Sequence, residues 1–414
     1  MRVDTADVLV IGSGPAGLTT ATRLRRLGVD EVVVLEREGD VGGIPRHSAH
    51  PSFGLRDYGR PMTGPRYVAA LVRGAERESV VIRTGTTVTG LGYTGKPYLT
   101  TQSAEGQTRW EADAIVLATG CRERPRSARL IPGTRAPGVF TTGELQQFTY
   151  LRGVKVGSRA VVVGAEHVSF SAVMTLRDAG IDCVAVITPF SAHQSYSPLR
   201  LWATRFGRVP LLTGHRLVGI EGRRRVDGVV VEGPDGRRGI DCDTVILTGE
   251  WVAEGSLALA AGLRADKRNG GRPSATAGGT TSLPGIYAAG SVVKPGESAA
   301  SATRSGRTVA EAVANQLSRP PGLDTTPGLS MEWESPIRWV SPQRASSRRP
   351  VPLELRVDQW VTDSTVVFRT DGTVLDTVSV RRLVPGRTYT FDGAWMGRVE
   401  EDGARVQVSI GVRS

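Results

Sequence analysis

Apolar runs alternating with amphipathic stretches predict a chain of strand-helix-strand units. Residues 8–11 form a run of four apolar residues, typical of a buried strand. Apolar side chains then recur at helical spacing over residues 18–27, which predicts a helix packed on that strand. A second apolar run covers residues 32–35 and ends on Glu36. The opening of the chain is therefore expected to be a βαβ unit with parallel strands.

The turn between the first strand and the helix fits the pattern G-x-G-x-x-G. Gly12 allows a tight turn, Gly14 lets the backbone approach a pyrophosphate, and Gly17 lets helix and strand pack closely. The free N–H groups and positive dipole end of the helix favour an anion there. Glu36 follows at the distance of a ribose-binding acid. Because strand, glycines, helix and acid agree, a dinucleotide site is favoured over an ordinary turn with chance glycines.

The same pattern returns at residues 159–187, which predict a strand, a glycine turn, a helix and another strand. A repeated βαβ unit indicates a second nucleotide-type domain. At a constant offset, however, Glu166 replaces Gly14, Ser169 replaces Gly17, and Thr188 replaces the ribose-binding acid. A carboxylate at the pyrophosphate position adds bulk and like charge. The second turn is therefore expected to bind NAD(P) poorly.

The rest of the chain adds strands and a different C-terminal region. Further strands are predicted at residues 114–118, 217–220, 226–232 and 244–247, with a turn at 233–239 and a closing helix at 299–317. Residues 318–329 are linker-like in composition. Short β-rich runs separated by turn residues then predict a small β-sandwich or barrel, for which we expect a docking or interface role. These runs are residues 353–357, 365–368, 378–380, 388–391 and 406–410.

Composition and charge exclude several classes of protein. The net charge of +11 comes almost entirely from arginines spread along the chain, since it contains four lysines and no basic patch interleaved with aromatic residues. Nucleic-acid binding is therefore not expected. Cys121, Cys183 and Cys242 are far apart and form no C-x-x-C pair, so a disulfide framework, a zinc site and an iron–sulfur site are unsupported. No metal is expected. Neither a signal peptide nor a membrane span is apparent, which predicts a cytoplasmic protein.

Three further segments give the chain a family resemblance. They are the paired Gly42 and Gly43, the Ala-Thr-Gly run at 118–120, and residues 284–291, PGIYAAGS. With the first glycine turn they resemble the pyridine nucleotide-disulfide oxidoreductase superfamily, in which FAD lies extended across the first Rossmann unit. The stretch 42–58, GGIPRHSAHPSFGLRDY, resembles the FAD subunits of hydrogen cyanide synthase, opine oxidase and dye-linked amino-acid dehydrogenases.

The resemblance implies FAD as cofactor and a set of residues that hold it. These are Gly12, Gly14, Pro15, Ala16, Gly17, Glu36, Arg37, Gly42, Gly43, Val88, Thr119, Gly120, Gly290 and Ser291. Ser291 stands where the family usually has an Asp for the ribityl chain. In disulfide reductases of this superfamily redox cysteines follow the double glycine, but Pro45 and His50 stand there. The resemblance therefore implies an oxidoreductase that does not use thiols.

The predicted fold class is α/β, with two Rossmann-like dinucleotide-binding domains, one for FAD and one NAD(P)-like, plus a small C-terminal all-β domain. The FAD-binding domain is expected to be discontinuous, at residues 1–122 and 276–318. The NAD(P)-like domain, with its altered glycine motif, is expected at 123–275. The linker is expected at 319–329 and the β domain at 330–414.

Arg46, His47 and His50 are the polar cluster that the resemblance places near the isoalloxazine, and they are the candidate catalytic residues. They could bind an anion and transfer protons, or they could order the loop by bonding backbone carbonyls. Glu297, after the third FAD segment, could lie near the flavin or cap the last helix. The sequence leaves both pairs of alternatives open.

Three functions remain in view. The favoured one is an electron-transferring FAD subunit that works with a partner flavoprotein on a small-molecule substrate, namely an amino acid, an imino acid or a similar amine. The second is a self-sufficient NAD(P)H-dependent flavin reductase. The third is a nucleotide-binding scaffold subunit. The altered second glycine motif favours the first or third.

Overall fold

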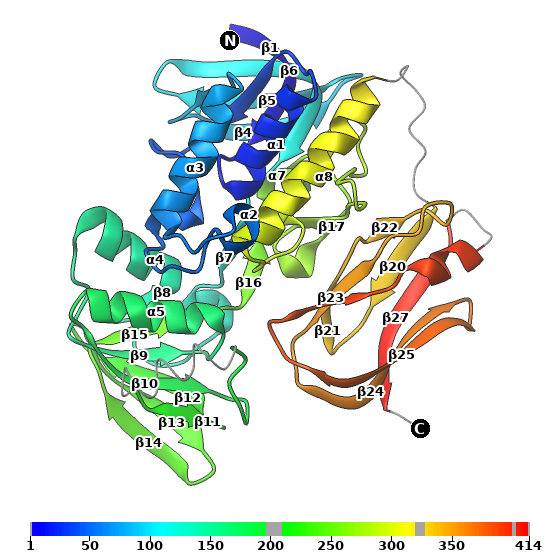
Figure 1. Ribbon diagram of the computed structural model, residues 1–414. Helices are drawn as coiled ribbons and strands as arrows, with labels where there is room; N and C mark the ends of the chain where they lie inside the picture. Colours follow the sequence, from blue (N-terminus) through cyan, green and yellow to red (C-terminus); the bar gives the residue numbers. More distant parts are fainter. Residues whose placement is uncertain (1, 196–208, 319–327, 400–402, 413–414) are drawn as a thin grey trace. The chain divides into compact units, whose positions relative to one another are not determined.

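The computed structural model describes residues 2–195, 209–318, 328–399 and 403–412. The chain forms two compact units, which Figure 1 colours along the sequence. Unit 1 comprises residues 1–43, 68–121 and 252–414, and unit 2 comprises residues 44–67 and 122–251. Residues 44–67, expected in the FAD-binding domain, lie in unit 2. Residues 252–275, expected in the NAD(P)-like domain, lie in unit 1. Most of the expected linker, residues 319–327, lies outside the described residues.

Unit 1 is built on a sheet of order β3-β2-β1-β6-β5-β4, with β19 paired to β6. The strands β3, β2, β1, β6 and β19 run parallel. Residues 8–11 of β1 are fully buried because parallel strands are covered on both faces. The bounds are β1 (Arg2–Ile11), β2 (Val32–Leu35), β3 (Val81–Arg83), β4 (Thr87–Tyr93), β5 (Pro97–Ser103), β6 (Gly106–Leu117) and β19 (Ile286–Ala288).

One strand is longer than the sequence pattern predicts. β6 is a continuous strand, whose first half pairs antiparallel with β5 and whose second half pairs parallel with β19. Residues 106–109 are accessible, buried and accessible residues alternate over 110–113, and residues 114–117 are all buried. The change of pattern at Asp113, which is exposed, is the reason that only residues 114–118 were expected as this strand.

Two helices of unit 1 pack against each other, α1 (Pro15–Arg26) and α8 (Ala299–Leu317) (Figure 1). They pack closely because Gly306 has no side chain: a Cβ there would lie 2.5 Å from Ala16 O. The hydroxyl of Thr20 donates to Gly306 O across the crossing, at 3.2 Å. Unit 1 also contains α7 (Ser256–Ala260), β17 (Ala265–Asp266) and β18 (Arg272–Pro273). Three elements include residues of both units, α3 (Gly64–Arg77), β7 (Cys121–Glu123) and β16 (Trp251–Ala253).

Unit 2 repeats the architecture with a parallel sheet of order β11-β10-β9-β15-β8 and an antiparallel sheet of order β12-β13-β14. Its bounds are α2 (Leu55–Tyr58), β8 (Val139–Thr141), α4 (Thr142–Gln146), β9 (Arg159–Val163), α5 (His167–Asp178), β10 (Asp182–Thr188), β11 (Leu211–Thr213), β12 (Arg216–Gly222), β13 (Val226–Gly233), β14 (Gly236–Asp241) and β15 (Thr244–Leu247). The α/β class with a parallel core is confirmed.

The prediction of a turn over residues 233–239 is correct only for its first half, because residues 236–239 belong to a strand. Gly233 pairs with Gly236, so the turn proper is the two residues Pro234 and Asp235, and β14 begins at once. Gly236 has φ +93°, which suits a tight hairpin. The arginines and glycines of β14 are exposed, and they hide the strand from a pattern that looks for apolar residues.

The C-terminal region consists of two sheets around one apolar core, with strand orders β22-β20-β27-β24-β25 and β21-β23-β26. Phe368 stacks on Trp395 in this core, with ring centroids 4.8 Å apart. The bounds are β20 (Leu329–Trp333), β21 (Ile337–Ser341), β22 (Arg344–Ala345), β23 (Leu353–Val357), β24 (Val361–Thr370), β25 (Thr373–Leu383), β26 (Thr388–Phe391) and β27 (Arg405–Val412). No helix of the described residues is long and apolar enough to cross a membrane.

The buried Arg272 connects this β region to the rest of unit 1 by hydrogen bonds to backbone carbonyls. Arg272 is fully buried and donates to Val293 O at 3.1 Å and to Val340 O at 3.0 Å. Its guanidinium lies 5.8 Å from the ring centroid of Trp339. A cation in such a place is stabilised by its carbonyl acceptors and the aromatic face. The C-terminal strands are therefore an integral part of unit 1.

Candidate functional site

The first glycine turn combines two positions that packing reserves for glycine with one that faces open space. Gly12 has φ +101°, and a Cβ there would lie 2.7 Å from Ala118 O. A Cβ at Gly17 would lie 1.9 Å from Gly12 O. A Cβ at Gly14, by contrast, would meet no atom of the chain within 4 Å. Gly14 precedes α1, which begins with Pro15 at a position that needs no N–H. This space at the helix N-terminus suits an anion.

Glu36 lies at the end of β2, with 7% of its surface exposed. Its Oε2 accepts hydrogen bonds from Ser13 N at 2.9 Å and Ser13 Oγ at 2.6 Å, and its Oε1 accepts from Glu38 N at 2.9 Å. These bonds fix the carboxylate beside the glycine turn. A carboxylate offers about four acceptor positions, so capacity remains for a ribose hydroxyl.

The paired glycines meet the first turn within unit 1. A Cβ at Gly43 would lie 3.0 Å from Gly14 Cα, and Gly42 donates to Ser13 Oγ at 3.1 Å. At Gly42, which has φ +121°, a Cβ would lie 2.3 Å from Val68 Cγ1. Both glycines are therefore required by close approach, and the two turns share one edge of the sheet.

The later segments reach the same edge. Thr119 Oγ1 donates to Glu254 O at 2.7 Å, while a Cβ at Gly120 would meet nothing within 4 Å. Gly290 has φ +75°, and a Cβ there would lie 2.6 Å from Ala16 Cβ. Ser291 is half-buried in the short 3-10 helix that follows β19. Open space at Gly14 and Gly120 beside the Glu36 carboxylate fits an extended dinucleotide.

Two of the expected cofactor residues lie less centrally. Arg37 is exposed and forms an ion pair with Glu38, with 3.5 Å between Nε and Oε1. Val88 lies on β4 and packs against the core of the sheet. A contact of either with the cofactor stays a prediction.

The candidate catalytic residues Arg46, His47 and His50 belong to unit 2. His47 is 5% exposed and bonds to the side chain of Gln146, and burial lowers the pKa of His47 to about 4. His50 stacks on Phe53 with ring centroids 5.1 Å apart, and burial lowers its pKa to about 4 as well. Both imidazoles are therefore neutral at pH 7 and weak as bases.

Gln146 is the partner through which this loop is held in unit 2. Its Oε1 accepts from Ser48 Oγ at 3.1 Å and its Nε2 donates to Ser171 Oγ at 2.9 Å. These contacts order the loop through a side-chain amide, and Ser48 Oγ also donates to the backbone carbonyl of Ile44, at 3.3 Å. They support an ordering role for His47, since a general base works best with a pKa near the working pH.

The second glycine turn is filled from within. Glu166 is the N-cap of α5; its side chain accepts from the backbone of Ser169, and Ser169 Oγ accepts from Glu166 N at 3.0 Å. A Cβ at Gly249 would lie 2.2 Å from Glu166 Oε1, so the carboxylate lies against that glycine. The backbone at Glu166 (φ −84°, ψ −177°) matches that at Gly14 (φ −69°, ψ −179°). The two turns therefore differ in side chain and not in conformation.

A buried ionic network in unit 2 was not anticipated. Glu123 accepts from Gly143 N and Gly249 N, both at 3.0 Å, and burial raises its pKa to about 7. Arg129 donates to Thr248 O and Gly249 O, both at 3.0 Å. In sequence these residues belong to a charged run that resembles a solvated loop. Their shared contact with Gly249 fixes the strand end that faces Glu166.

Glu297 and the three cysteines are the other residues that the sequence analysis singled out. Glu297 does not cap α8, because Ser298 does so by accepting from Ser301 N at 3.2 Å. Glu297 instead accepts from Arg356 Nη2 at 2.6 Å. The three cysteines are free, and burial raises the pKa of Cys183 to about 12 and of Cys242 to about 11. Such thiols are poor nucleophiles. Among the described residues no His, Cys, Asp and Glu side chains cluster as a metal site.

Comparison with known proteins agrees with this geometry. The family model described as pyridine nucleotide-disulphide oxidoreductase matches residues 6–312. One of the subunits of the opine oxidase of Agrobacterium tumefaciens (strain Ach5) is 28% identical over 69% of this chain and 61% of its own length. The alpha chain of the sarcosine oxidase of Corynebacterium sp. (strain P-1) is 28% identical over 52% of this chain and 22% of its own length. The chain thus spans about three fifths, or less, of these relatives.

The fold has solved counterparts. The crystal structure of T. acidophilum thioredoxin reductase superposes with a TM-score of 0.64 at 21% identity, covering 76% of this chain and 99% of that one. The open space at Gly14 and Gly120 beside Glu36 is called the cradle below. Because the family model covers most of the chain, the resemblance in sequence is confirmed. The chain belongs to the pyridine nucleotide-disulphide oxidoreductase family of FAD-binding oxidoreductases.

Proposed function

We propose that this chain is the FAD-carrying subunit of a dehydrogenase or oxidase that acts on an amino acid, an imino acid or a similar amine. The observation that carries the proposal is the contrast between the two glycine turns. The space at Gly14 is open to a pyrophosphate, whereas Glu166 places a carboxylate at the equivalent helix N-terminus. One chain thus offers one dinucleotide cradle and one turn that its own side chain has filled.

In the cradle, each residue has a stated task. The N-terminus of α1 at Gly14 would hold the pyrophosphate, and Glu36 would accept from a ribose hydroxyl. The Ser291 hydroxyl would bond the ribityl chain more weakly than the carboxylate usual in the family. When bound, FAD supplies the two-electron acceptor for substrate oxidation.

A self-sufficient NAD(P)H-dependent reductase is the alternative that this geometry disfavours. A pyrophosphate at α5 would have to displace the Glu166 carboxylate from its bonds to the helix N-terminus and would meet its charge. Thr188 offers no carboxylate to a ribose. A scaffold subunit with a nucleotide site remains the third candidate, and the open cradle in unit 1 supports the FAD subunit over it.

The names of the relatives support the substrate class and the partner. Two of them are named as subunits, of an opine oxidase and of a sarcosine oxidase. By analogy we propose that this chain works with a partner flavoprotein. The buried, protonated thiols support a reaction that does not use cysteine.

The test is co-expression with each oxidoreductase encoded beside this gene, followed by size exclusion and a dye-linked assay over amino and imino acids. A stable complex in which both chains are needed for dye reduction is expected. A chain that stays alone and oxidises such a substrate at a competent rate would contradict the subunit proposal and leave the FAD cradle intact.

A further inference from the structure

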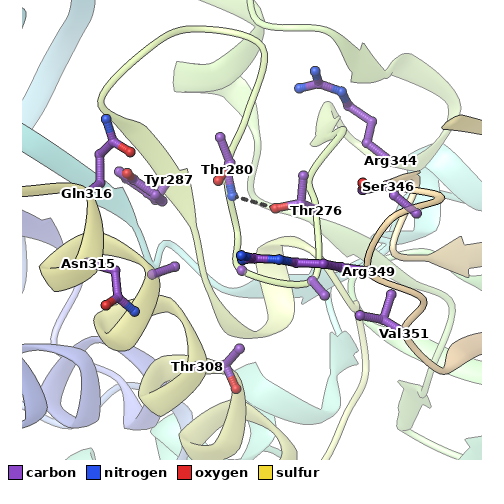
Figure 2. A pocket seen from close by; sticks show the side chains of 14 residues that line it. Thr276, Thr280, Tyr287, Thr308, Asn315, Gln316, Arg344, Ser346, Arg349 and Val351 are labelled. Carbon is purple, nitrogen blue, oxygen red and sulfur yellow. Dashed lines mark hydrogen bonds between the residues drawn. The ribbon is translucent and has the colours of Figure 1, made fainter. Parts of the chain in front are cut away.

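A cavity of about 400 Å³ opens in unit 1, away from the residues of the FAD cradle. One wall is α8, a second is the loop at 276–280, and the third is the start of the C-terminal β region at 344–351. Figure 2 shows the side chains that line it. Cavities of 300–1,000 Å³ are the usual size for small-molecule ligands.

The lining has positive charge and many groups that form hydrogen bonds. Arg349 contributes a guanidinium, and none of the fourteen lining residues is acidic. The guanidinium of Arg349 reaches between Thr276 and Thr308 on opposite walls, as Figure 2 shows. Asn315 of α8 adds an amide. Such a set favours an oxyanion, since a guanidinium binds carboxylate and phosphate in a bidentate way.

The backbone holds these groups in place before any ligand arrives. Arg344 is 6% exposed and donates to Thr281 O at 2.9 Å. A tight turn places Arg349, whose N–H donates to Ser346 O at 3.2 Å. Ser346 Oγ accepts from Arg348 N at 3.2 Å, which leaves its hydroxyl hydrogen for an acceptor on a ligand. On the opposite wall, Thr276 Oγ1 accepts from Thr280 N at 3.0 Å. The Thr276 hydroxyl is thus held before a ligand binds, which reduces the entropy lost on binding, whereas the Arg349 side chain is exposed.

We infer that this cavity binds a small metabolite that carries a phosphate or carboxylate group and is no larger than a mononucleotide. The anion lies between Arg349 and the hydroxyls of the 276–280 loop. Because the walls come from both the α/β part and the C-terminal β region of unit 1, the bound ligand also stabilises their packing. Binding at this cavity does not depend on the reaction at the flavin.

The test is calorimetric titration of the full-length, FAD-loaded chain with four probes: inorganic phosphate, AMP, succinate and uncharged adenosine. Arg349→Glu is compared with the matched variant Arg348→Glu, since Arg348 is exposed, adjacent in sequence and absent from the lining. At least one anionic probe is expected to bind. Its affinity should fall at least about tenfold in Arg349→Glu, the cost of a lost charged hydrogen bond, and should stay within about twofold in Arg348→Glu.

Binding of phosphate or AMP assigns a phosphate-bearing ligand, and binding of succinate assigns a carboxylate. If no anion binds, if adenosine binds as tightly as AMP, or if both variants lose affinity equally, the inference is wrong. FAD absorbance and the thermal midpoint establish that the variants are folded. If Arg349→Glu unfolds, Arg349→Gln removes the charge without reversing it, and the same comparison applies.

Discussion

Gly14 and Glu166 have the same extended backbone, but only Glu166 has a side chain. We propose that this difference decides what each helix N-terminus can bind. In unit 1 the absence of a Cβ leaves space for a ligand's phosphates. In unit 2 the carboxylate bonds to the first turn of α5, as an N-cap should. Negative charge near a helix N-terminus is stabilising. The residue that closes the second site therefore also stabilises its helix.

Introducing the unit 2 side chain into unit 1, as Gly14→Glu, should yield folded protein without FAD. The new carboxylate would occupy and repel the pyrophosphate position, whereas the ordinary φ of −69° makes the substitution unstrained. FAD released on denaturation is measured per chain. Gly39→Glu is the matched control, because a Cβ there also meets nothing within 4 Å. A Gly14→Glu protein with full FAD would mean that the cofactor lies elsewhere.

His47 should make the protein sensitive to acid. Its folded pKa of about 4 lies below its ordinary value of 6.5, so stability is fully present above pH 6.5 and is lost as pH falls through 6.5 toward 4. Between pH 7 and pH 5 the contribution of His47 to this loss is expected to be roughly 2 kcal/mol. It is read as the difference between the parent chain and the variant, because His50 and Glu123 also titrate over this range. His47→Gln should reduce this loss in denaturant titrations at the two pH values. An unchanged loss in the variant would show that His47 is not the group responsible.

The cysteines should be dispensable for turnover. Replacing Cys121, Cys183 and Cys242 together by Ala should leave a folded protein that retains FAD and its reduction by substrate. The reason is that burial raises the pKa of Cys183 and of Cys242, and that all three cysteines are free and far apart in the sequence. Absorbance at the flavin band reports both properties. A variant that keeps its fold and FAD but loses reduction would give a cysteine a redox role.

Among the secondary structure elements, those with strong periodicity could be predicted from sequence and those held by distant contacts could not. The first βαβ unit and its glycine turn follow from local pattern, as does the repeat around Glu166. Strands such as β14 escape because their side chains are exposed. The roles of Arg272 and Arg356 could not be predicted, since buried arginines depend on carbonyls supplied by residues far away in the chain. The relatives, not the fold, indicate the substrate class.

The loop between β19 and α8 is held by the β region. Arg356 bonds to Pro295 O at 3.0 Å and to the Glu297 carboxylate, and Lys294 pairs with Glu354 at 2.7 Å. The Arg356 and Glu297 side chains are 7% and 15% exposed. This loop follows Gly290 and Ser291, so the C-terminal strands support the third cofactor segment directly.

Arg356→Gln should therefore destabilise the protein strongly, by about 3 kcal/mol, because it leaves Glu297 as a buried, unpaired charge. Arg381→Gln, on the exposed face of β25, is the control and should change the free energy of unfolding by less than about 0.5 kcal/mol. Denaturant titration measures both. Equal, small effects would show that the β region does not hold this loop through Arg356.

At the scale of the whole molecule, the chain combines an open cradle at Gly14, a turn filled by Glu166, and two buried cysteines whose pKa values are raised. If, as we propose, the second turn does not bind a nicotinamide and no cysteine takes part, electrons must reach the flavin from an organic substrate or another flavoprotein. The proposed function, in which this chain works with a partner flavoprotein, meets this requirement.

The most direct test is anaerobic mixing of the FAD-loaded chain with NADH and with NADPH, followed at the flavin absorbance band. Dithionite is added afterwards to show that the flavin can be reduced. Slow bleaching or none by either nicotinamide, followed by full bleaching with dithionite, is the predicted result. Rapid bleaching at micromolar NADH or NADPH would contradict the proposed function, because it would require a pyrophosphate to bind where Glu166 now lies.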